Sequence, residues 1–118
     1  MEIFSKIKGG ARRMDIKITT DEETVTAFIQ GDIDHHTAKD IREQIDEYVQ
    51  DKRPRLLNLD FSGVQFMDSS GIGLIMGRHR IMQLLKGSVK VVNIPEHLKR
   101  LIKISGLLSL GVIAEGEV

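Results

Sequence analysis

Two kinds of apolar repeat alternate along this chain, and this alternation limits the possible folds more than any other feature of the sequence. Apolar residues recur at every second position in some segments, as in strands, and at every third or fourth position in others, as in helices. The repeats predict strands at 14–19, 25–29, 56–61, 89–92 and 110–114, and helices at 38–49, 69–85 and 95–105. The order β-β-α-β-α-β-α-β predicts an α/β fold, with helices packed on a mixed sheet of four to five strands.

Residues that favour turns and helix ends separate these segments. The polar run at 20–23 predicts a β-hairpin between the first two strands. Thr37 followed by Asp40 resembles a capping box that starts the first helix. A loop is expected at 62–68, before the second helix, and Gly87 is expected to end that helix.

The length of 118 residues suits one domain, which we expect to span 14–118. Residues 1–13 contain four basic side chains and one acidic side chain, and we expect them to be a disordered extension. A short basic amphipathic helix that contacts a membrane surface or a partner is the alternative for this segment, but its few apolar residues bury too little surface for strong binding.

Composition excludes several classes of protein. Seventeen basic residues balance seventeen acidic ones, whereas nucleic-acid-binding proteins usually carry a basic excess. The absence of cysteine excludes disulfides, thiolate nucleophiles and cysteine-based zinc sites. No apolar run approaches the roughly 20 residues that span a bilayer. We therefore expect a cytoplasmic protein that does not bind nucleic acid or membrane directly.

The most informative segment enters the second helix. Asp68, Ser69 and Ser70 precede its apolar repeat, and each of them can cap the helix. The N-terminus of a helix has unpaired N–H groups and a partial positive charge, which suit an anion or a phosphoryl group. Gly71 and Gly73 are expected to leave the first turn open to another molecule. An ordinary capped helix, a phosphorylatable serine and a catalytic serine are all compatible with this pattern.

Catalysis has little support in the sequence. A serine nucleophile needs a base, and the four histidines follow no known serine-hydrolase spacing. Both the G-x-S-x-G elbow and the P-loop motif are missing. Adjacent His35 and His36 rarely face one metal ion, so we expect them to be surface residues at the start of the first helix. We therefore expect no catalytic residue, no metal and no cofactor.

Two motifs together resemble a known family. Residues 66–73 read Phe-Met-Asp-Ser-Ser-Gly-Ile-Gly, and residues 31–38 read Gly-Asp-Ile-Asp-His-His-Thr-Ala. Both are similar to the motifs of STAS-domain anti-sigma factor antagonists, particularly the sporulation type, and they have that family's separation. Residues 104–107, Ile-Ser-Gly-Leu, extend the resemblance, which covers 14–114.

The resemblance implies a regulatory protein that works by binding partners and is not an enzyme. In this family the unphosphorylated antagonist binds an anti-sigma factor that is also a serine kinase, and this binding releases a sigma factor. The kinase then uses ATP to phosphorylate the antagonist, which dissociates, and a serine phosphatase restores it. The resemblance places the phosphorylated residue at Ser69 and places Asp34 beside it.

The resemblance, the open helix N-terminus and the excess apolar surface of the second helix together predict the positions that contact the partner or support the phosphorylated serine: Asp34, Asp68, Ser70, Gly71, Ile72, Gly73 and Met76. Asp34 can instead serve only as a helix cap, and Met76 can instead belong to the core. Residues 78–80 are expected on a solvated side, although Arg78 can pair with a partner carboxylate. Two other functions stay open: a STAS module in the scaffold of a stress-signalling complex, and a weak nucleotide-binding protein.

Overall fold

The computed structural model describes the backbone of residues 2–6 and the whole of residues 14–118. Its elements are β1 (Glu2–Lys6), β2 (Met14–Asp21), β3 (Thr24–Ile33), α1 (Ala38–Lys52), β4 (Leu56–Met67), α2 (Ser69–Leu84), β5 (Ser88–Val92), α3 (Glu96–Ile104) and the short 3₁₀ helix η1 (Leu107–Leu110). The strands form one sheet in the order β1-β2-β3-β4-β5. The pairs β1–β2 and β2–β3 are antiparallel, and β3–β4 and β4–β5 are parallel. The predicted α/β class with a mixed sheet is confirmed.

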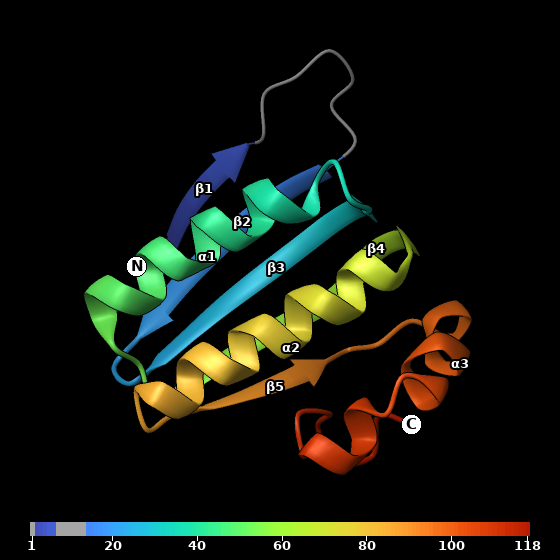
Figure 1. Cartoon of the computed structure of the whole chain (residues 1–118). Coiled ribbons are helices and arrows are strands. Elements are labelled where there is room, and N and C mark those ends of the chain that lie inside the picture. The colour runs from blue at the N-terminus through green and yellow to red at the C-terminus, as the bar shows by residue number, and fades with distance from the viewer. Residues whose placement is uncertain (1, 7–13) are drawn as a thin grey trace.

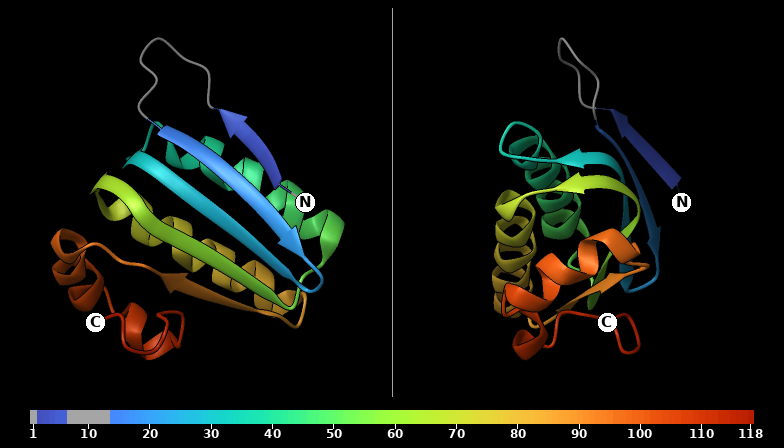
Figure 2. Two further views of the ribbon diagram at one scale, coloured as in Figure 1. Left: turned by 180° about the vertical axis from the view of Figure 1, so that it is seen from behind. Right: turned by 90° about the vertical axis from the view of Figure 1, so that its right-hand side faces the viewer.

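Helices α1 and α2 lie side by side on one face of the sheet (Figure 1). Seen from behind, β2, β3 and β4 lie in front of these two helices, and α3 and η1 lie beyond the β5 edge (Figure 2). Within the part of the chain that the structure describes, no helix is both long and apolar enough to cross a bilayer.

Alternation of side chains on β2 and β3 explains how the sheet meets its helices. Ile16 and Ile18 of β2 and Ala27 and Ile29 of β3 are buried, and the residues between them are more exposed. A sheet covered on one face produces this pattern, because successive side chains point to opposite faces. The buried strand residues pack with helix residues that repeat at helical spacing: Ile41, Ile45, Val49, Leu74, Ile75 and Met82.

Strand β4 is twice as long as the sequence predicts. The loop expected at 62–68 is wrong, because the strand continues to Met67. The register between β3 and β4 shifts twice along this stretch, so the buried residues after Phe61 are Val64 and Met67 rather than every second residue. This spacing of three hides a strand from a search for alternating residues.

The C-terminal segment also differs from the prediction. The strand expected at 110–114 is wrong, since only one bridge pairs it with the sheet, between Val91 and Ile113. Gly106 and Gly111 have positive φ angles on either side of η1 and break the extended path. Val112 and Ile113 are nevertheless buried. The apolar run therefore signals burial rather than strand.

The opening segment was expected to be disordered throughout. In the structure Glu2–Lys6 form β1, which pairs with β2 from Glu2 opposite Thr19 to Lys6 opposite Asp15. A strand can form here because the outer edge of β2 offers backbone donors and acceptors, which β1 satisfies. The remainder of the predicted extension, 7–13, lies outside the described residues.

The end of α2 does not use Gly87 as predicted. Lys86 adopts the left-handed conformation, with φ of 62°, and its N–H donates to the Gln83 carbonyl. The Gly87 N–H donates to the Met82 carbonyl at 2.7 Å, which completes a Schellman motif. Glycine is needed at 87 for space, because a Cβ there would lie 2.9 Å from the Arg55 carbonyl oxygen.

A buried ion pair joins α1 to α2. Arg78 was expected on a solvated side, but its side chain is only 4% exposed and its Nε lies 2.8 Å from Oδ1 of Asp46. The two atoms are close but not aligned as a hydrogen bond, so attraction between charges dominates the contact. Burial raises the pKa of Asp46, and the nearby guanidinium groups of Arg78 and Arg42 oppose that rise. Removing one partner of such a pair is costly, because the other charge stays buried.

We predict that Arg78→Met lowers the free energy of unfolding by about 3 kcal/mol at pH 7, because Asp46 loses its counter-charge. Without Arg78 the pKa of Asp46 in the folded state rises further above its unfolded value. A carboxyl group with a raised pKa favours folding when it is protonated, and this contribution is lost as pH rises through the folded pKa. The difference from the parent should therefore shrink as pH falls, which urea unfolding at several pH values measures.

The double variant Arg78→Met with Asp46→Leu is the control for this prediction. It leaves no buried charge, so it should recover most of the lost stability at pH 7 and show little pH dependence of its own at this position. A stability loss in Arg78→Met that stays constant across pH would show that lost packing, and not the stranded carboxylate, is responsible.

Candidate functional site

The first predicted loop is held by Asp34. Its Oδ1 accepts hydrogen bonds from the backbone N–H groups of His36, at 2.9 Å, and Thr37, at 3.0 Å. In return the Asp34 N–H donates to the Thr37 hydroxyl at 3.0 Å. This reciprocal pair is a capping box in which threonine takes the usual glutamate position. The predicted box between Thr37 and Asp40 is therefore wrong and lies three residues too late. Asp34 is 8% exposed, so capping is its structural role.

The second loop has a simpler cap. Oδ1 of Asp68 accepts a hydrogen bond from the Ser70 N–H at 2.7 Å, and the Gly71 N–H donates to the Asp68 carbonyl at 3.0 Å. Ser69 is the first residue of α2 and is exposed. Ser70 is half-buried and takes part in the cap through its backbone rather than its hydroxyl. The two serines therefore have different environments.

Pairing between β3 and β4 brings these two loops together. Ile33 and Met67, the last residues of the two parallel strands, are partners in the ladder, and the Asp68 N–H donates to the Ile33 carbonyl at 3.2 Å. Because parallel strands end at the same edge of a sheet, the helices that follow them begin there too. The structure therefore places Asp34, Asp68 and the two serines at one end of the molecule, beside two positively polarised helix N-termini.

The two glycines of the motif have opposite roles. Both were expected to leave the first turn open. Gly71 is buried, and a Cβ on it would lie 2.2 Å from Cγ and 2.3 Å from Sδ of Met67. That expectation is wrong for Gly71. The absence of a Cβ at this position allows α2 to pack closely against the end of β4. A Cβ on Gly73 would meet no atom within 4 Å. Only Gly73 leaves the helix surface open.

Two large apolar side chains are exposed on the two elements that flank the exposed serine, β4 and α2. Met76 on α2 is 42% exposed, and Phe66, near the end of β4, is 51% exposed. Ile72 is half-buried and packs partly on the core. Sequence reasoning singled out Met76 and Ile72 but missed Phe66, because a large aromatic residue beside a strand end is ordinarily expected inside. Exposed apolar side chains that form one patch mark a surface that contacts another molecule, and Phe66 and Met76 are candidates for such a patch.

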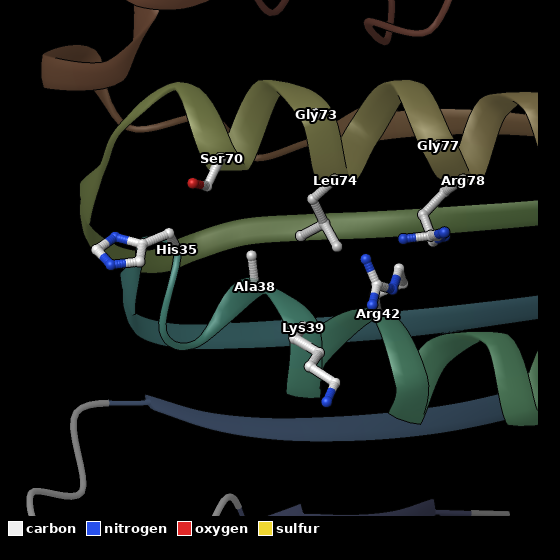
Figure 3. Close-up of a pocket in the computed structure, with 9 residues that line it drawn as sticks. All are labelled: His35, Ala38, Lys39, Arg42, Ser70, Gly73, Leu74, Gly77 and Arg78. Carbon is white, nitrogen blue, oxygen red and sulfur yellow. The ribbon is translucent and has the colours of Figure 1, made fainter.

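A groove of about 470 Å³ runs between α1 and α2, starting beside Ser70. Figure 3 shows its lining residues, which come from α1, from α2 and from the loop that precedes α1. They are His35, Ala38, Lys39, Arg42, Ser70, Gly73, Leu74, Gly77 and Arg78. Gly73 and Gly77 widen the groove on the α2 side, because they have no side chains and the space that a Cβ would occupy is open. The remaining polar side chains make the groove mostly basic.

Comparison with known proteins identifies the family. The STAS domain family matches residues 15–115. The chain belongs to the STAS domain family.

Relatives of this STAS domain are antagonists of anti-sigma factors. An anti-sigma F factor antagonist of Paenibacillus polymyxa is 36% identical over 90 residues, which cover 76% of this chain and 77% of that protein. An anti-sigma-B factor antagonist of Bacillus subtilis is 28% identical over 108 residues, or 89% and 97% of the two chains. The fold is similar to that of the anti-sigma factor antagonist SpoIIAA in its unphosphorylated form, with a TM-score of 0.73 and 27% identity over 84% of this chain and 85% of that one. The phosphorylated form of SpoIIAA from Bacillus gives a TM-score of 0.66, at 27% identity over 84% and 88%.

The adjacent histidines of this STAS domain lie at the surface. His35 and His36 are both exposed, and their ring centroids are 3.9 Å apart. Among the residues that the structure describes, no three side chains of the metal-binding types gather into one group. His35 is nevertheless a groove residue, which its sequence position alone does not indicate.

Alanine substitutions at the two motif glycines should change stability in opposite directions. Gly71→Ala forces the middle of the buried Met67 side chain to move, which we expect to cost about 1–3 kcal/mol of unfolding free energy. Gly73→Ala adds a Cβ in open space within a helix and should stabilise the domain by up to about 1 kcal/mol. Chemical unfolding of both variants tests this contrast, and equal effects would contradict the different packing of the two positions.

Proposed function

We propose that this STAS domain is an anti-sigma factor antagonist controlled by phosphorylation of Ser69. The unphosphorylated form binds an anti-sigma factor with serine kinase activity and thereby releases a sigma factor. Phosphorylation ends this interaction, and a serine phosphatase restores it. The protein acts as a binding partner and carries out no reaction itself. The observation that carries the proposal is an exposed serine at the start of α2, at the sheet edge where α1 also begins, with exposed apolar side chains on β4 and α2.

Exposure favours Ser69 over Ser70 as the phosphorylated residue. The Ser69 side chain is exposed, whereas Ser70 is half-buried at the groove between α1 and α2. A kinase must place the hydroxyl in line with the γ-phosphate of ATP, which requires an accessible side chain. In that step the bond from phosphorus to the Ser69 oxygen forms, the bond to the leaving ADP oxygen breaks, and the hydroxyl proton passes to a base on the kinase.

The N-terminus of α2 is able to hold a phosphate without refolding. The first N–H groups of a helix lack helical partners, and the helix dipole favours a negative charge there. The Asp68 carboxylate already satisfies the Ser70 N–H, so it keeps the first turn in place when Ser69 changes its charge. The same cap places a carboxylate one residue from the added phosphate.

Like charges explain why the phosphorylated form would leave its partner. A phosphate adds about −1.5 to −2 charges at neutral pH, next to Asp68 and close to the Asp34 loop. On a surface that also presents Phe66 and Met76, a docked partner would exclude water from this charge. An unpaired dianion in a water-poor contact opposes binding, and each 1.4 kcal/mol weakens affinity about tenfold.

The relatives support this role without choosing its circuit. The proteins reported above include antagonists of both anti-sigma F and anti-sigma-B factors. SpoIIAA, which has a similar fold, is known in phosphorylated and unphosphorylated forms. We favour the sporulation type, because the anti-sigma F antagonist of Paenibacillus polymyxa has the higher identity of the two sequence relatives.

Incubation with ATP and a candidate anti-sigma kinase should add one phosphoryl group to the parent protein and none to Ser69→Ala. The reason is that only Ser69 presents an exposed hydroxyl at the start of α2. Intact-mass spectrometry measures the gain, and Ser70→Ala is the matched control that should gain the group like the parent. A gain in Ser69→Ala that disappears in Ser70→Ala would move the site to Ser70.

Phosphorylation should leave the fold intact. Both helix caps are made by aspartate side chains and backbone groups that do not involve the Ser69 hydroxyl, so they persist when it is esterified. In amide correlation spectra we expect shifts near Asp34 and Ser69 and little change in β5 or α3. Shifts spread across the whole domain would contradict a switch that acts through surface charge.

A further inference from the structure

The groove between α1 and α2 contains more basic than acidic groups. Lys39, Arg42 and Arg78 line it, together with His35. Glu43 lies 3.9 Å from Lys39 on the exposed surface, and Asp46 is paired with Arg78. Within the part of the chain that the structure describes, Arg42 has no ion pair of its own. Arg42 instead shares the Asp46 carboxylate with Arg78, so Lys39, Arg42 and Arg78 outnumber the two carboxylates by one positive charge.

Two guanidinium groups converge in this groove. Figure 3 shows Arg42 of α1 and Arg78 of α2 extending toward each other across it. Burial lowers the pKa of Arg78, Asp46 opposes this, and the positive charge of Arg42 lowers it further, so the two arginines repel each other. Arg78 is 4% exposed, and its Nη1 has no hydrogen-bond partner in the described part of the chain. Arg78 also lines the groove, so the two guanidinium groups together concentrate positive charge along it.

We propose that this groove receives a carboxylate side chain of the docked anti-sigma factor, with Arg42 as its direct contact. A carboxylate accepts two parallel hydrogen bonds from a guanidinium group, and it would add a second negative charge beside two arginines that share Asp46. Lys39 and His35 line the same groove, and so does Arg78, which is paired with Asp46. This assignment rests on the proposed function, because it names how the same partner is held.

A side chain of a bound protein fits this groove better than a free anion. Arg42 and Lys39 are exposed, and ion pairs in water at such positions are weak and screened by salt. A partner docked over Ser69 would bring its carboxylate to the groove at a high effective concentration and would exclude water from the contact. Ser70 lies both next to Ser69 in the sequence and at the groove, so one partner surface can reach both places.

Arg42→Glu should weaken binding of the candidate anti-sigma factor at least tenfold at low salt, and Arg42→Gln should weaken it less. Titration calorimetry with the full chain measures both affinities, at two salt concentrations. Arg80→Glu is the matched control, because Arg80 is exposed on the same helix as Arg78, does not line the groove, and gives the same change in net charge. It should bind like the parent. Thermal unfolding of each variant confirms that the fold is retained.

Charge exchange identifies the partner residue. Arginine substitutions at acidic positions of the anti-sigma factor should include one that restores binding to Arg42→Glu. Equal losses in Arg42→Glu and Arg80→Glu, or no loss in either, would overturn the groove contact while leaving the proposed function intact. Failure of the parent to bind any candidate anti-sigma factor would overturn both. Saturable binding of inorganic phosphate by the parent alone below millimolar concentration, lost in Arg42→Glu, would assign the groove to a free anion instead.

Discussion

Parallel pairing of β3 with β4 is the constraint on which the candidate site depends. The ladder holds Ile33 opposite Met67, and one hydrogen bond beyond it ties Asp68 to Ile33. Two segments more than thirty residues apart in sequence therefore leave the sheet at the same point, and each starts a helix there. An antiparallel arrangement would put the two helix starts at opposite ends of the strands. The neighbourhood of Asp34 and Ser69 is thus a consequence of strand direction rather than of any contact between their side chains.

Close packing at this edge gives some residues of the motif an internal structural role. Gly71 lets α2 approach Met67, and the Asp34–Thr37 box fixes the turn before α1. Both features are internal, yet they set where the exposed Ser69 lies. A motif read as a binding sequence is therefore partly a folding sequence. Residue type does not separate the two roles, since both positions are glycine. Packing does: a Cβ would clash with Met67 at Gly71 but would lie in open space at Gly73.

Sequence alone predicts the order of the main elements, since regular repeats on β2, β3, α1 and α2 reflect one buried face each. It does not predict the length of β4, where register shifts replace alternation with the spacing of Phe61, Val64 and Met67. Resemblance to a family marks Ser69 and Asp34, and the sequence allows Asp34 to cap a helix, but it does not predict that Thr37 completes the capping box with Asp34. The burial of Arg78 was also unpredictable, because its counter-charge, Asp46, lies 32 positions earlier on another helix.

A domain of this size can change partners without changing shape, provided that the changing charge lies outside the core. The caps of α1 and α2 rest on Asp34 and Asp68, so a new charge on Ser69 replaces no internal hydrogen bond of the described structure. The groove beside it depends on charges that are fixed by the buried pair of Arg78 and Asp46, and that pair is remote from the serine along the helix. In the proposed switch, the caps therefore rest on Asp34 and Asp68, whereas the charge that changes is on Ser69. Surface electrostatics would then alter affinity by a few kcal/mol, while the core that holds both helix N-termini in register stays the same.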